Sequence, residues 1–121
     1  YSYREYGNRI GIWRVLDILD RLRLPAAVAT NLIAARRHPE LLAAFAARGF
    51  EPVAHGLSAT RMVTARMSEA EERSHIRKAR DGLVALWPGA TGWLGQDHGA
   101  TPATTRLLRD AGFDYALDWA N

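Results

Sequence analysis

Four short apolar runs separate longer stretches of helical periodicity along this chain of 121 residues. The runs cover residues 26–30, 50–54, 91–94 and 113–117, and each has the length of a strand rather than of a helix. Successive strands that are joined by helices form parallel sheets through right-handed crossovers. The sequence therefore predicts an α/β protein with parallel strands alternating with helices, in the order α-β-α-β-α-β-α-β. The first run has no apolar–polar alternation, which predicts a strand buried on both faces.

Local signals predict where the helices begin and end. Asn8 is a candidate cap for a helix to Arg23, and His38-Pro39 interrupts a helical region at residues 31–48. Ser68 and Glu71 form a capping box for a helix that reaches Leu86. Thr101 and Pro102 open the last helix, which Gly112 ends. The first helix has one apolar face, made by Ile12, Val15, Leu16, Leu19 and Leu22.

Polar residues follow the strands at the points where the strands end. These residues are Asn31, His55, Gln96-Asp97-His98 and Asp118-Trp119. Open α/β sheets and (β/α) barrels carry their active sites at the carboxyl ends of the strands. We therefore expect a functional site at this edge. His38 and His75 instead fall within helices among Arg, Ala and Glu, and we expect both at the surface.

His55 is the best candidate for chemistry at this edge. It ends an apolar strand and precedes Gly56, so its imidazole can act as a general base or as a metal ligand. A structural histidine without a role is an equally good interpretation. Asp118 is a carboxylate in the same kind of place. Trp93 and Trp119 can bind substrate by stacking on a sugar, or can simply pack at the rim.

Composition excludes several classes of function. The chain has no Cys, so thiol nucleophiles, disulfides and thiolate zinc sites are ruled out, and a cytoplasmic protein is favoured. No apolar run is long enough for a membrane span. The 16 basic residues include a single lysine and are spread over every predicted helix, which indicates a solvated surface rather than a nucleic-acid interface. Heavy use of Ala and Arg points to GC-rich, bacterial coding.

Several motifs, in order, resemble the polysaccharide deacetylase family and most closely its allantoinase-like branch. They span nearly the whole chain and are Glu5-Tyr6-Gly7-Asn8-Arg9 with Trp13-Arg14, Val53-Ala54-His55-Gly56, Glu71-Glu72-Arg73 with Ile76, Gly92-Trp93, Thr104-Thr105-Arg106-Leu107-Leu108 and Gly112-Phe113-Asp114-Tyr115. The resemblance implies a distorted (β/α) barrel of about seven strands. Residues 1–121 would then be a single domain, the central segment of such a barrel, incomplete at both ends.

The resemblance also implies a hydrolase that acts on non-peptide carbon–nitrogen bonds, of the deacetylase or ureide amidohydrolase type. The substrate would be a small molecule or a sugar, and the context would be carbohydrate metabolism. His55 and Asp118 are the expected catalytic residues, with Trp93 and Trp119 binding substrate. Metal-dependent members hold a divalent ion such as zinc with one Asp and two His, and some allantoinase-like members work without metal.

The sequence departs from the family pattern at one ligand position. His55 matches the first metal-binding His, but Ala59 stands where the second is expected. The alternative to an enzyme is therefore a degenerate, non-catalytic member that binds a ligand or serves as a structural domain. A segment of a barrel also leaves an open sheet edge. We expect a second copy of the chain, in a homo-oligomer, or further chain segments to cover that edge.

Overall fold

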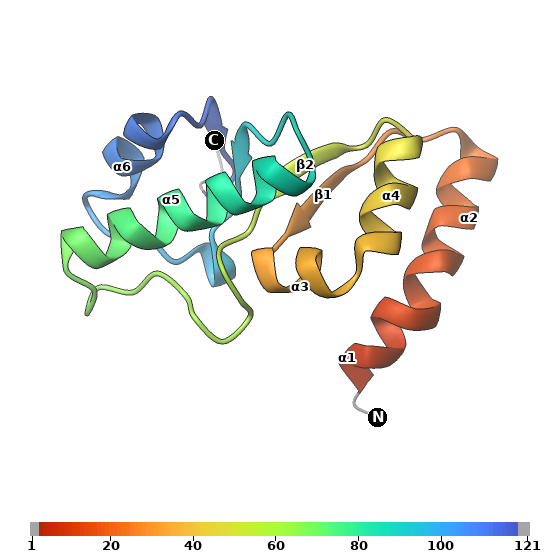
Figure 1. Cartoon of the computed structure of the whole chain (residues 1–121), viewed down its shortest axis with the longest axis horizontal. Coiled ribbons are helices and arrows are strands. Elements are labelled where there is room, and N and C mark those ends of the chain that lie inside the picture. The colour runs from red at the N-terminus through yellow and green to blue at the C-terminus, as the bar shows by residue number, and fades with distance from the viewer. Residues whose placement is uncertain (1–2, 119–121) are drawn as a thin grey trace.

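The computed structural model describes residues 3–118, with side chains from residue 5 onward (Figure 1). Its elements in chain order are α1 (Tyr3–Tyr6), the π-helix η1 (Gly7–Gly11), α2 (Ile12–Leu22), β1 (Ala27–Thr30), α3 (Leu32–Arg37), α4 (Pro39–Ala47), β2 (Glu51–Ala54), α5 (Glu69–Leu86), β3 (Gly92–Trp93), the 3-10 turn η2 (Gln96–His98), α6 (Thr104–Ala111) and β4 (Tyr115–Ala116). No helix in this part of the chain is both long and apolar enough to cross a membrane.

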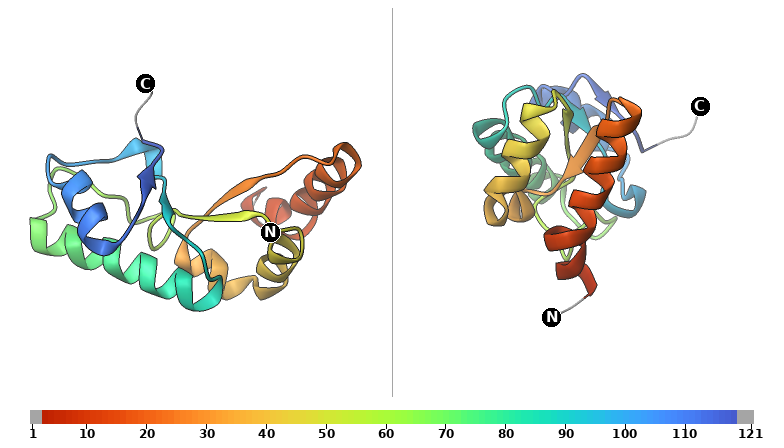
Figure 2. Two further views of the ribbon diagram at one scale, coloured as in Figure 1. Left: turned by 90° about the horizontal axis from the view of Figure 1, so that it is seen from above. Right: turned by 90° about the vertical axis from the view of Figure 1, so that its right-hand side faces the viewer.

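The four strands form one parallel sheet in the order β1-β2-β3-β4. Each strand therefore lies beside the strand that follows it in the chain. Because every crossover is right-handed and runs toward the same edge, the crossover helices lie on one face of the sheet. Figure 2 shows α5, α3 and α4 in a row along one side of the strands. The predicted α/β class is confirmed. Consecutive parallel strands with one-sided helices are also the arrangement of a (β/α) barrel, and within residues 3–118 β1 and β4 are the two edges of the sheet.

The face of the sheet opposite these helices is exposed over β1. Ala27 and Ala29 are exposed, whereas Val28 and Thr30 are partly buried on the helix side. The expectation that this strand is buried on both faces was therefore wrong, because nothing in residues 3–118 covers one side of it. By the alternation of a strand, His55 lies on the same face of the sheet as Glu51 and Val53, and Val53 is buried on that face.

The core lies between the sheet and the helices. Trp93 packs edge-on against Phe113, with ring centroids 5.5 Å apart, and Phe45 stacks on Trp87 at 5.9 Å. Helix α5 contributes a buried stripe at helical spacing, made by Glu72, His75, Ile76, Ala79 and Leu83. This stripe packs directly under β2 and β3, so α5 is the element that supports the strand ends that carry His55 and Trp93.

Three expectations about the helices need correction. The first helical run begins at Tyr3, so Asn8 lies inside it and caps nothing, and its amide lies 3.5 Å from His38 Nε2. On α2 only Leu16 is fully buried, and Val15 and Leu22 are exposed. Helix α6 begins at Thr104 rather than at Pro102, because residues 101–104 form a turn in which the Thr104 hydroxyl accepts from the Thr101 N–H at 2.7 Å.

His75 is buried rather than at the surface, and only 2% of it is exposed. The helical spacing that places it beside Ile76 and Ala79 overrides its polar neighbours in the sequence. Its Nδ1 has no hydrogen-bond partner. Burial lowers the pKa of His75 below its usual 6.5, and the charge of Arg61 lowers that pKa further, while Glu72 opposes them. His75 is therefore held in its neutral form.

The lowered pKa of His75 predicts acid sensitivity. Below about pH 6.5 the unfolded chain takes up a proton at His75 that the folded chain does not, so the free energy of unfolding falls as the pH drops. Denaturant unfolding from about pH 7.5 to about pH 5.5 should show a smaller fall in His75→Gln than in the wild type. The control is His98→Gln, at an exposed histidine, and its free energy of unfolding should fall with pH as much as that of the wild type. An equal fall in all three proteins would contradict a role for His75.

Candidate active site

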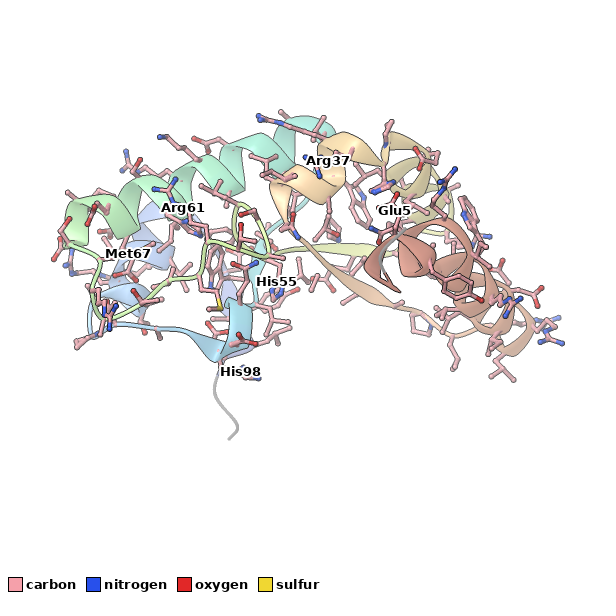
Figure 3. The ribbon with its side chains drawn as sticks, turned by 90° about the horizontal axis from the view of Figure 1, so that it is seen from below. Glu5, Arg37, His55, Arg61, Met67 and His98 are labelled. Atoms are coloured by element: carbon pink, nitrogen blue, oxygen red, sulfur yellow. The ribbon has the colours of Figure 1, made fainter. Side chains whose placement is uncertain are left out.

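His55 is fixed by a hydrogen bond across the carboxyl ends of two strands. It follows β2, is partly buried, and lies 2.7 Å through Nδ1 from the carbonyl oxygen of Leu94, which follows β3. A carbonyl only accepts, so Nδ1 carries the proton and Nε2 is left with its lone pair. Nε2 makes no hydrogen bond among the described residues. Figure 3 shows His55 near the middle of the molecule, with Arg61 and Met67 to one side and Glu5 and Arg37 to the other.

Asp118 holds the same peptide group from the opposite side. Its Oδ1 accepts from the Gly95 N–H at 2.5 Å, and its Oδ2 is buried without a partner. The Leu94 carbonyl and the Gly95 N–H belong to one peptide unit, so His55 from β2 and Asp118 from β4 clamp it together. A Cβ at Gly95 would lie 2.9 Å from Asp118 Oδ1, so only glycine admits this approach.

Backbone hydrogen bonds continue the strand pairing up to this clamp. The N–H of His55 donates to Thr30, that of Leu94 donates to Ala54, and that of Leu117 donates to Trp93. The three strand ends are thus in register at the level of the candidate site. The predicted convergence of His55 and Asp118 on one edge is what the structure shows, and the two side chains meet through a shared peptide group.

Gln96 joins the loops that follow β2 and β3. Its amide Nε2 donates to the Ser58 carbonyl at 2.6 Å, and the side chain is only 8% exposed. Gln96 belongs to the polar set that the sequence predicts at this edge, without a predicted role. Its position directly after a strand was the only signal. The backbone contact that it makes has no signature in the sequence.

The other residues predicted for this edge lie in different settings. Trp93 is 1% exposed and packs on the helix side against Phe113, so its placement gives no support to the predicted role in substrate binding. Trp119 lies outside the described residues. Asn31 caps α3 by accepting from the Ala34 N–H at 2.9 Å. Asp97 and His98 are exposed on a turn in which both have left-handed φ angles of 49° and 54°.

The described residues do not complete a zinc site. Zinc in catalytic sites takes three protein ligands, and here His55 Nε2 is one free nitrogen donor. Ala59, four residues later, is exposed and offers only a methyl group. No group of three or more His, Asp or Glu side chains within residues 3–118 is arranged to hold a metal ion. The lone pair of His55 Nε2 can accept a proton or serve as one ligand of a metal ion.

Comparisons with known proteins identify the family. The family model for polysaccharide deacetylases matches residues 5–116. A search of curated proteins gave no significant match. Among solved structures, the PuuE allantoinase is 34% identical with a TM-score of 0.82 over 94% of this chain. A protein from Pseudomonas aeruginosa PAO1 assigned as a polysaccharide deacetylase is 36% identical with a TM-score of 0.80 over 93% of this chain.

Two further structures extend the comparison. A protein from Mycobacterium smegmatis assigned as a polysaccharide deacetylase is 26% identical with a TM-score of 0.83 over 93% of this chain. A CE4 family pseudoenzyme from Bacillus anthracis is 13% identical with a TM-score of 0.80 over 92% of this chain and shares the fold. The chain spans 37% of the PuuE and Pseudomonas structures and 39% of the other two. The match over residues 5–116 confirms the expected resemblance, and the chain belongs to the polysaccharide deacetylase family.

Proposed function

We propose that this protein hydrolyses a non-peptide carbon–nitrogen bond, in an N-acetyl group or a ureide, with His55 as the general base. The hydrogen bond between His55 Nδ1 and the Leu94 carbonyl carries the proposal. It selects the tautomer whose Nε2 can accept a proton, and it holds the ring in one orientation. The family match and the PuuE and deacetylase structures support this class of reaction.

In this mechanism His55 Nε2 takes a proton from water while the water oxygen adds to the carbonyl carbon of the substrate. The carbon–nitrogen bond then breaks, and the proton passes from Nε2 to the departing nitrogen, so the imidazole is neutral again. While the ring is charged, the Leu94 carbonyl accepts from Nδ1–H and stabilises it. No step runs through a metal, because the described residues do not complete a metal site.

Asp118 acts in this proposal mainly through the Leu94–Gly95 peptide group, to which both Asp118 and His55 form hydrogen bonds. Its Oδ1 fixes the Gly95 N–H and thereby the Leu94 carbonyl that orients the imidazole. Its Oδ2 is buried without a partner, and a buried polar atom in that state is suited to receive a donor from a substrate or another side chain. We therefore assign Asp118 a positioning role, with Oδ2 as the atom that orients a further group.

A non-catalytic role is the second candidate, and Ala59 is the observation that favours it. A member of this family that lacks the second metal-binding His can bind a ligand at the same edge without turning it over. The Bacillus anthracis structure is described as a pseudoenzyme, which documents such loss elsewhere on this fold. Turnover by the wild-type protein separates the two candidates.

We further infer the setting of the activity from the sequence and the open sheet. The absence of Cys and the coding bias favour a bacterial, cytoplasmic protein, and zinc is the divalent ion that the family pattern suggests. We infer that residues 1–121 form one domain corresponding to the central part of the barrel. Its edges at β1 and β4 would pair with a second copy or with further chain segments.

The first prediction from this proposal is loss of activity in His55→Ala. The wild type should hydrolyse allantoin-like ureides or N-acetylated sugars, assayed with and without a chelator. Removal of a general base should lower kcat by roughly 10²–10⁴-fold. The control is His98→Asn, at an exposed histidine on the neighbouring turn, and it should retain the wild-type rate because asparagine tolerates the left-handed φ of this residue. An unchanged rate in His55→Ala would remove His55 from the mechanism, and an inactive wild type would favour the non-catalytic candidate.

The second prediction concerns the metal position. In Ala59→His an imidazole stands where the family pattern has its second metal-binding His, so zinc should bind more tightly than to the wild type. Isothermal titration with zinc chloride measures the difference. The double variant His55→Ala/Ala59→His is the matched control and should lose the gain. Equal zinc affinity in the wild type and in Ala59→His would show that residue 59 does not face the same site as His55.

A further inference from the structure

A single side chain, Gln96, connects the loops on either side of the candidate site. Gln96 begins the turn after β3, and its amide donates to the carbonyl of Ser58 at 2.6 Å. Ser58 lies three residues beyond His55 and directly before Ala59. The loop that follows His55 is therefore joined to the loop that follows β3 by a partly buried hydrogen bond.

Gly56 allows this amide to approach the backbone next to His55. A Cβ at Gly56 would lie 3.2 Å from Gln96 Oε1 and 3.1 Å from His75 Nε2, and its φ of +75° also favours glycine. Gln96 Oε1 is buried without a partner. A buried acceptor without a donor costs stability, so folding alone does not explain an amide at this position. The Nε2 end of the same amide makes the hydrogen bond that holds the loop after His55, and this bond accounts for the amide.

The loop that carries Gln96 is itself held in place. Glu72, a buried carboxylate on α5, accepts from the Thr101 hydroxyl at 2.6 Å and from the Thr104 hydroxyl. Gly99 lies so close to the Val63 carbonyl that a Cβ there would come within 2.5 Å of the oxygen. These contacts hold the loop of residues 95–104 against α5 and against Val63. The hydrogen bond from Gln96 in turn holds Ser58 at a fixed place relative to this loop.

We propose that Gln96 is a positioning residue that holds the Ser58–Ala59 segment beside His55 and thereby sets where a substrate lies relative to Nε2. The contacts of Gln96 support its role in holding the loop. The effect of Gln96 on substrate binding rests on the proposed function. His55 keeps its own bond to Leu94 in either case. Loss of the Gln96 bond should therefore loosen the loop and weaken substrate binding, while the hydrogen bond between His55 and Leu94 stays in place.

Two variants test the inference. Gln96→Met keeps the length of the side chain and removes its hydrogen bonds, and Gln96→Asn keeps the amide but shortens its reach. Asp97→Asn is the matched control, because Asp97 is the exposed next residue and asparagine tolerates its left-handed φ. Native-state hydrogen exchange should be about tenfold faster in both Gln96 variants at the amides of Arg61 and Ile33, which donate to the Ser58 and Leu57 carbonyls of this loop. A tenfold change corresponds to a loss of roughly 1.4 kcal/mol of local stability. Unchanged exchange there in whichever variant folds would overturn the inference.

Kinetics separate this inference from the proposed function. On an allantoin-like ureide or an N-acetylated sugar that the wild type hydrolyses, the Gln96 variants should raise KM several-fold and leave the pH profile of kcat unchanged. An unchanged KM with faster exchange would overturn the effect on substrate. A wild type that hydrolyses neither substrate would contradict the proposed function, and the exchange result would still decide whether Gln96 holds the loop.

Discussion

The peptide group between Leu94 and Gly95 is the point on which the candidate site depends. His55 donates to its carbonyl from β2, and Asp118 accepts from its N–H from β4. Strands β2, β3 and β4 place these groups in register, and glycine at position 95 lets the carboxylate come close. One rigid peptide unit thereby determines both the tautomer and the orientation of the imidazole. Without it, His55 would be a mobile histidine at the end of a strand.

Helix α5 packs against the carboxyl ends of β2 and β3, where the candidate site lies. Its buried stripe packs under β2 and β3, and Glu72 holds the loop after β3 through two threonine hydroxyls. His75, on the same stripe, lies beside Gly56 and faces the ring edge of Trp93. Glu72 and His75 are both buried in the layer that lies against the strand ends. The supporting layer therefore serves the site as well as the core.

The sequence predicted what local signals control. Apolar runs, caps and Pro39 located the strands and most helices, and the strand-end rule brought His55 and Asp118 to one edge. The side chains' contacts with residues far away in the sequence could not be predicted in the same way. Trp93 sits on a strand of two residues, which is too short for alternation to assign its face. His75 does carry a signal, since its spacing to Ile76, Ala79 and Leu83 is that of a buried helical stripe. The contacts of Gln96 and Asp118 are to backbone atoms, which no residue pattern reports.

The central claim is that His55 is held as the tautomer protonated at Nδ1, with Nε2 free to accept a proton. Long-range proton–nitrogen NMR of the imidazole at about pH 7.5 measures this directly, with His55→Gln to assign the signals. We predict a protonated Nδ1 and an unprotonated, pyridine-like Nε2 for His55. A signal from the tautomer protonated at Nε2 would contradict it, because that ring could neither donate to Leu94 nor act as the base at this edge.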